Sequence, residues 1–158
     1  MATLNNNEVN NVMNAIKVAP TTWAELRAII EQELKRQGKD ADLNFIDTSK
    51  ITDMSYLFQD LEIRNIKIDQ WDVSNVTNMA YMFDNATLFN CVLSSWNVSK
   101  VTDMECMFYN AKSFNSDLPA WDLSNVKSKT YMLCGATSFK GRLSDWDAEK
   151  IAKEVQMD

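Results

Sequence analysis

The chain repeats itself every 25 residues, and this period constrains its fold more than any other feature. The segment WDVSNVTNMAYMFDNATLFN begins at Trp71, and close copies begin at Trp96 and Trp121. A fourth copy starts at Trp146 and soon diverges, while an earlier copy starts at Ile46 in the same register. A fixed period of this length is typical of stacked repeat proteins, in which each unit buries its apolar face against its neighbours.

Within one repeat, the apolar residues follow the leucine-rich-repeat skeleton. In segment 93–101 they occupy the L-x-x-L-x-L-x-x-L positions, with Trp96 in one leucine slot. Residues 95–99 alternate between apolar and polar, which predicts a short strand with Trp96 and Val98 pointing inward. The helical spacing of the apolar residues that follow predicts a short helix. The sequence therefore predicts an α/β solenoid: a short, right-handed, leucine-rich-repeat-like stack of parallel strands and short helices.

Both ends of the stack are expected to be closed by helices, because terminal repeats need a polar cover. Thr22, followed three residues later by Glu25, forms a capping-box pattern and predicts a helix over about 22–37. After Trp146 the pattern predicts a last helix, capped by Ser144 or Asp145. The predicted parts are a tail and capping helix over 1–41, four repeats over 42–145 with the first divergent, and a C-terminal capping helix over 146–158.

Composition excludes several classes of function. The chain has no histidine, which removes His-dependent catalysis and the commonest zinc sites, and its three glycines form no phosphate-binding loop. We therefore expect no enzyme activity, no cofactor and no metal. A net charge of −6 without a basic cluster argues against nucleic-acid partners. No apolar run approaches the ~20 residues that span a bilayer, so direct membrane insertion is not expected either.

The three cysteines do not form a disulfide pattern. Cys91, Cys106 and Cys134 fall at different positions of the repeat, whereas a disulfide framework would use an even, matched set. We expect three buried free thiols that act as small apolar side chains. This expectation favours a reducing compartment.

The repeat unit resembles a known family. The segments DLNFIDTSKITDMSYLF and WDVSNVTNMAYMF…ATLFN, within residues 42–146, are similar to the BspA-like leucine-rich-repeat family of bacterial surface proteins. The resemblance implies a non-enzymatic protein-binding or adhesion module, at the cell surface or secreted, with a host surface or matrix protein as partner. The alternative is a cytoplasmic or delivered protein-interaction factor, such as an inhibitor or effector, built on the same scaffold.

Two polar columns run along the expected strands and are the candidate binding residues. Their side chains are short and lie between the inward apolar positions, so they are expected on the outer face. Three interpretations of these columns are open. They could contact a protein partner, they could supply carboxylate ligands for calcium, or they could be structural groups that hydrogen-bond the backbone at strand ends. The columns are Asp47, Asp72, Asn97, Asp122 and Asp147, and Ser49, Ser74, Ser99 and Ser124.

Overall fold

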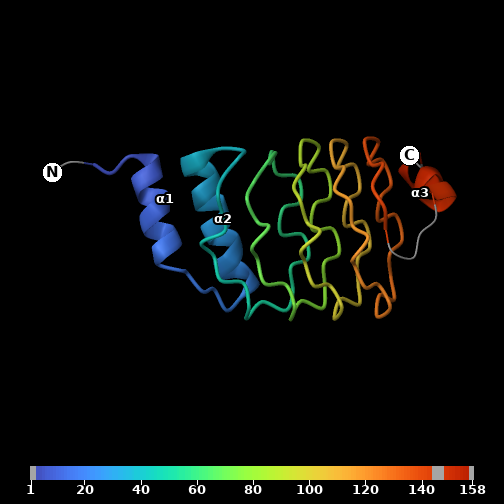
Figure 1. Cartoon of the computed structure of the whole chain (residues 1–158), viewed down its shortest axis with the longest axis horizontal. Helices are drawn as coiled ribbons and strands as arrows, with labels where there is room; N and C mark the ends of the chain where they lie inside the picture. The colour runs from blue at the N-terminus through green and yellow to red at the C-terminus, as the bar shows by residue number, and fades with distance from the viewer. Residues whose placement is uncertain (1–2, 144–147, 157–158) are drawn as a thin grey trace.

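A computed structural model describes residues 3–143 and 148–156, and it shows an elongated molecule built from stacked repeats (Figure 1). Its helices are α1 (Asn6–Ala15), α2 (Trp23–Gln37) and α3 (Ala148–Val155). Helices α1 and α2 lie at one end, the repeats follow one behind another, and α3 lies at the other end. The helix predicted over 22–37 is confirmed, since α2 covers all but the first of those residues.

The prediction of an α/β solenoid is wrong. Between α2 and residue 143 the described chain contains no helix and no strand, and isolated parallel bridges join neighbouring repeats. One row of bridges connects Asp53 to Asn78 and Asn78 to Asp103. Turns and irregular segments stand where the strand over 95–99 and the short helices were expected. The repeats stack, but not as parallel strands backed by helices.

In place of the expected helix, each repeat contains two left-handed residues, four positions apart. In the first repeat these are Tyr56, with φ 59°, and Asp60, with φ 58°. A right-handed helix requires negative φ at every position, so it cannot pass through either residue. The segment instead forms consecutive β-turns, in which Leu57, Gln59 and Leu61 each donate their N–H to the carbonyl three residues earlier.

The remaining N–H groups of this segment bind the next repeat. Met54, Tyr56, Phe58 and Asp60 each donate to the carbonyl oxygen 24 residues further on, at 2.8–3.0 Å. The same pattern links the second repeat to the third and the third to the fourth. We call this set of bonds the turn ladder. Because its amides alternate between a turn bond and a ladder bond, the segment satisfies its backbone without regular secondary structure.

Aromatic side chains fill the centre of the stack in two columns. Phe58, Phe83 and Phe108 stack at 5.3 and 5.5 Å between ring centroids. The second column, Phe89, Phe114 and Phe139, runs parallel to the first and touches it, with Phe108 and Phe114 centred 4.0 Å apart. On another side of the core, three buried indoles donate to carbonyls of the preceding repeat. These indoles belong to Trp71, Trp96 and Trp121.

Helix α2 closes the first end of the stack by supplying side-chain donors. The indole of Trp23 donates to the Ser55 carbonyl at 2.8 Å, and Nη1 of Arg27 donates to the Leu57 carbonyl at 2.6 Å. In the next repeat the equivalent carbonyls accept ladder bonds from the first repeat. Leu26 and Ile30 of α2 are fully buried in the core. The helix therefore takes the place of a preceding repeat, both in its hydrogen bonds and in its apolar contacts.

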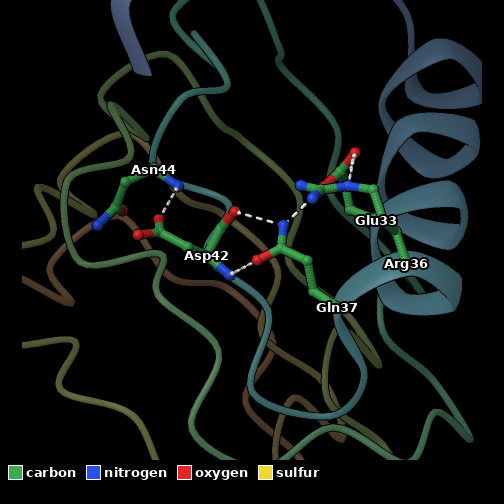
Figure 2. A network of polar contacts seen from close by, with 5 residues as sticks. All are labelled: Glu33, Arg36, Gln37, Asp42 and Asn44. Atoms are coloured by element: carbon green, nitrogen blue, oxygen red, sulfur yellow. Dashed lines mark hydrogen bonds and ion pairs between the residues drawn. The ribbon is translucent and has the colours of Figure 1, made fainter. Parts of the chain in front are cut away.

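A polar network fastens the end of α2 to the start of the first repeat (Figure 2). Glu33, only 4% exposed, accepts from Arg36 Nε at 3.0 Å and from Gln37 Nε2 at 2.6 Å. The Gln37 side chain also accepts from the Asp42 N–H at 3.1 Å, and Asp42 in turn accepts from the Asn44 N–H at 3.1 Å. Because the buried carboxylate is held by charged and polar donors, its burial is compensated.

Helix α3 closes the opposite end with an acceptor. The backbone N–H of Leu133, at a position that makes a ladder bond in the earlier repeats, hydrogen-bonds the Glu154 carboxylate. Burial raises the pKa of Glu154, and the hydrogen bond from Leu133 opposes the rise. Val155 of the same helix is also buried. The predicted cap residues Ser144 and Asp145 lie outside the described residues.

Removing the Phe108 ring should destabilise the protein far more than removing the Cys106 thiol. Both side chains are buried, but Phe108 contacts ring neighbours in its own repeat and in both adjacent repeats. Phe108→Ala should lower the free energy of unfolding by ~3–5 kcal/mol. Cys106→Ala should cost clearly less, and urea denaturation measures both. Equal losses would contradict the central role assigned to the ring columns.

Removing α2 should abolish cooperative folding. A chain beginning at Asp40 lacks the donors to Ser55 and Leu57 and exposes the apolar end of the first repeat. A chain beginning at Lys17 is the control, because it keeps α2 and the backbone bonds between Val18 and residues 45 and 47. Circular dichroism should show a cooperative melt for the control and a broad one, or precipitation, for the shorter chain. Matching melts would make α2 an appendage.

Candidate functional site

The two predicted columns lie together on one side of the stack, and each acidic or amide side chain closes a local turn. Oδ1 of the first residue accepts the N–H of the serine two positions later, at 3.0–3.1 Å, in an Asx turn. We call these residues the Asp/Ser face. Its described pairs are Asp47 with Ser49, Asp72 with Ser74, Asn97 with Ser99, and Asp122 with Ser124. Asp147 lies outside the described residues.

The Asp/Ser face is open to solvent and negatively charged. Asp72, Asn97 and Asp122 are exposed, and Asp47 is partly exposed. The hydroxyl and N–H of the serine two positions on lower the pKa of Asp47, Asp72 and Asp122, so these carboxylates are ionised at neutral pH. Asn97 makes the same bond without a charge, which shows that the turn needs the acceptor oxygen but not the ionised group.

A neighbouring row of residues, which the sequence analysis did not select, links the Asp/Ser face of each repeat to that of the repeat before it. Asn75 Nδ2 donates to the Ser49 carbonyl at 2.9 Å, and Asn125 Nδ2 donates to the Ser99 carbonyl at 2.6 Å. Between them, Lys100 Nζ donates to Asn75 Oδ1 at 2.8 Å. In the sequence this row could have been found by its position, because Lys and Asn alternate directly after the serine column, as Lys50, Asn75, Lys100 and Asn125. These bonds hold the exposed groups of adjacent repeats in fixed relative positions.

Nothing in the geometry supports the calcium alternative. Within residues 3–143 and 148–156, no three His, Cys, Asp or Glu side chains gather closely enough to hold a metal ion. On the Asp/Ser face each carboxylate already accepts bonds from its own serine.

The cysteines are buried free thiols, as predicted. Burial raises the pKa of Cys91 to about 12, and Cys91 Sγ donates to the Ile66 carbonyl at 2.9 Å. Burial also raises the pKa of Cys106. Because the thiolate is the nucleophilic form, neither group is activated for covalent chemistry. No helix in the described part of the chain is long and apolar enough to cross a membrane.

The lowered pKa values predict an acid-sensitive contribution to stability. A carboxylate with a depressed folded-state pKa stabilises the fold above its unfolded pKa, near ~4, and this contribution disappears as the pH falls through the folded value. Replacing Asp47, Asp72 and Asp122 together by Asn keeps the acceptor but removes the titration. The unfolding free energy of this variant should therefore fall less steeply between about pH 5 and pH 2.

The pKa of Asp84 is shifted in the opposite direction, so its replacement should change the pH dependence of stability in the opposite sense. Burial raises its pKa, so its ionised form weakens the fold at neutral pH and protonation relieves that effect. Asp84→Asn should therefore make the acid-side loss of stability steeper than in the native chain. Denaturation curves at several pH values compare both variants, and parallel pH profiles for all three proteins would contradict the assigned shifts.

Comparison with known proteins identifies a family but no characterised relative. The family model described as "Mycoplasma protein of unknown function, DUF285" matches residues 27–157. No curated protein and no solved structure matches the chain significantly. The matched segment contains most of α2, all the described repeats and α3. Since the match extends over most of its length, the chain belongs to the DUF285 family.

Proposed function

We propose that the chain is a non-enzymatic protein-binding module and that the Asp/Ser face is its contact surface. The proposal rests on one observation: the polar groups of this face are regularly spaced, exposed to solvent and held in place by hydrogen bonds. Its polar groups recur once per repeat, and the Asx turns and the Asn75 and Asn125 bonds fix them before any partner arrives. Preorganised short side chains lose little conformational entropy on binding, which favours recognition of a second protein.

The chemistry of the chain supports binding over catalysis. No histidine is present to act as a general base, and burial raises the pKa of both Cys91 and Cys106. The resemblance of the repeats to BspA-like surface proteins supports an exposed or secreted location, with a host surface or matrix protein as partner. The face is acidic, so a partner with a basic surface would be steered toward it.

A cytoplasmic interaction factor is the second candidate, and the three buried free thiols favour it. Free cysteines persist most readily in reducing compartments. Fractionation of the producing cell distinguishes the two locations. Recovery in the cytosol alone would reject the surface module, and recovery at the surface or in the medium would reject the cytoplasmic factor.

The binding face can be tested with two matched pairs of substitutions. Immobilised protein is incubated with extracellular-matrix proteins and, separately, with lysate of the producing cell, and the captured proteins are identified and titrated. Asp72→Asn with Asp122→Asn should weaken capture about fivefold, because two exposed charges contribute ~0.5 kcal/mol each. The Asx turns at positions 72 and 122 should still form, because Asn97 forms the same turn in the native chain.

Asp53→Asn with Asp103→Asn is the control pair. These residues also close Asx turns, and the native Asn78 makes the same turn between them. The control removes the same charge from the turn ladder, on another side of the repeat. Capture should remain at the native level. If the control pair weakens capture and the Asp72 and Asp122 pair does not, the contact surface is on the turn ladder instead.

A further inference from the structure

A second surface feature lies where α2 meets the first repeat. A groove of about 570 Å³ opens there, bordered by Trp23, Arg27 and Glu31 of α2 and by Tyr56 and Asp60 of the first repeat. We call it the α2 groove. Trp23 is 39% exposed and Tyr56 is 45% exposed. The groove belongs to the turn ladder and α2, whereas the Asp/Ser face belongs to a different segment of each repeat.

Both aromatic rings are held in place by contacts outside the groove. The Trp23 indole donates to the Ser55 carbonyl at 2.8 Å. Tyr56 stacks on Tyr81 with ring centroids 4.8 Å apart and ring planes 4° from parallel. Because Tyr81 belongs to the second repeat, it covers the face of Tyr56 that points away from α2. Tyr56 also lines the groove and is 45% exposed, so part of the ring remains accessible there.

At Tyr56 the turn ladder places an aromatic residue in a backbone conformation that bulky residues disfavour. Each repeat has two left-handed positions. At one of them the residues are Asp60, Asn85, Asn110 and Gly135, which are the types that adopt this conformation most easily. At the other they are Tyr56, Tyr81, Cys106 and Tyr131. A bulky ring is unfavourable at such a position. The same conformation recurs in all four repeats, so the turn ladder imposes it on Tyr56.

The charges around the groove sum to one negative charge. Arg27 Nε binds Glu31 Oε1 at 2.7 Å, and Arg27 also donates to the Leu57 carbonyl, so this pair neutralises itself. Asp60 is exposed, and its carboxylate makes no hydrogen bond or ion pair within the described part of the chain. The groove thus combines two fixed aromatic rings with one uncompensated carboxylate.

We propose that the α2 groove binds a cationic side chain, arginine or lysine, presented by a protein partner. A cation over the exposed part of the Tyr56 ring interacts with the ring quadrupole, and Asp60 supplies the opposite charge. Arginine suits the site better, because its flat guanidinium can stack on the ring while donating to a carboxylate. The proposal rests on the proposed function, since it gives the protein partner a basic residue, but it uses a different surface.

A pair of short peptides tests the groove without a known partner. The probes are acetyl-Gly-Gly-Arg-Gly-Gly-amide and the same peptide with citrulline, which keeps the shape of arginine and removes its charge. Binding is followed by NMR through the indole N–H signal of Trp23, assigned with Trp23→Phe. The arginine peptide should shift this signal and bind about 3- to 30-fold more tightly than the citrulline peptide. Equal binding of the two peptides, or no shift with either, would overturn the proposal.

Asp60→Asn and Asp122→Asn are the matched variants. Asn85 and Asn110 occupy the position of Asp60 in later repeats, so Asp60→Asn should keep the left-handed backbone and the melting temperature. Asp60→Gly, which copies the native Gly135 of the last repeat, provides a second variant if the first is unstable. Either change should weaken arginine-peptide binding at least threefold, while Asp122→Asn should leave it unaltered. If Asp122→Asn weakens it equally, the peptide responds only to net charge and the groove is not its site.

These outcomes separate the groove from the proposed function. Loss of capture in the Asp72 and Asp122 pair, together with no selective peptide binding, would leave the protein-binding module in place and reject the groove. Selective peptide binding that depends on Asp60, together with unchanged capture by the Asp72 and Asp122 pair, would support the groove and remove the Asp/Ser face from the contact surface.

Discussion

The turn ladder is the constraint on which the rest of the structure depends. Its amides alternate between a bond inside the turn and a bond to the next repeat, and this alternation requires a left-handed residue at two places in every unit. Once these positions are fixed, the inward residues of successive repeats fall directly behind one another. The phenylalanine columns and the buried indoles then form by repetition of a single unit. The period of 25 residues is therefore a backbone requirement as much as an apolar pattern.

The sequence predicted the register and the interior correctly, and it predicted the local backbone incorrectly. Met54, Leu57, Phe58 and Leu61 point inward, as a helical spacing suggests. Consecutive β-turns place inward residues at the same spacing, so apolar periodicity cannot distinguish the two structures. The distinguishing signal was the series Asp60, Asn85, Asn110 and Gly135, whose members all tolerate positive φ. The tyrosines at the other left-handed position concealed it.

The two candidate surfaces differ in how far they could be predicted from the sequence. An Asp or Asn two positions before a serine, repeated in every unit, is a recognisable turn signal, and the Asp/Ser face is built from it. The α2 groove joins Trp23 to Tyr56, which are distant in sequence, and nothing in a periodic pattern indicates how α2 is oriented against the first repeat. The capping box at Thr22 fixed where the helix begins but not which of its residues remain exposed.

The two ends of the stack are chemically opposite. One presents carbonyl oxygens, which Trp23 and Arg27 satisfy, and the other presents the amide hydrogen of Leu133, which Glu154 satisfies. Without α2 and α3, the last repeat of one molecule would match the first repeat of another, and the ladder would continue across the junction. Such a head-to-tail contact does not close on itself and grows into a filament. The terminal helices therefore cap both ends of a self-complementary stack and oppose its head-to-tail polymerisation.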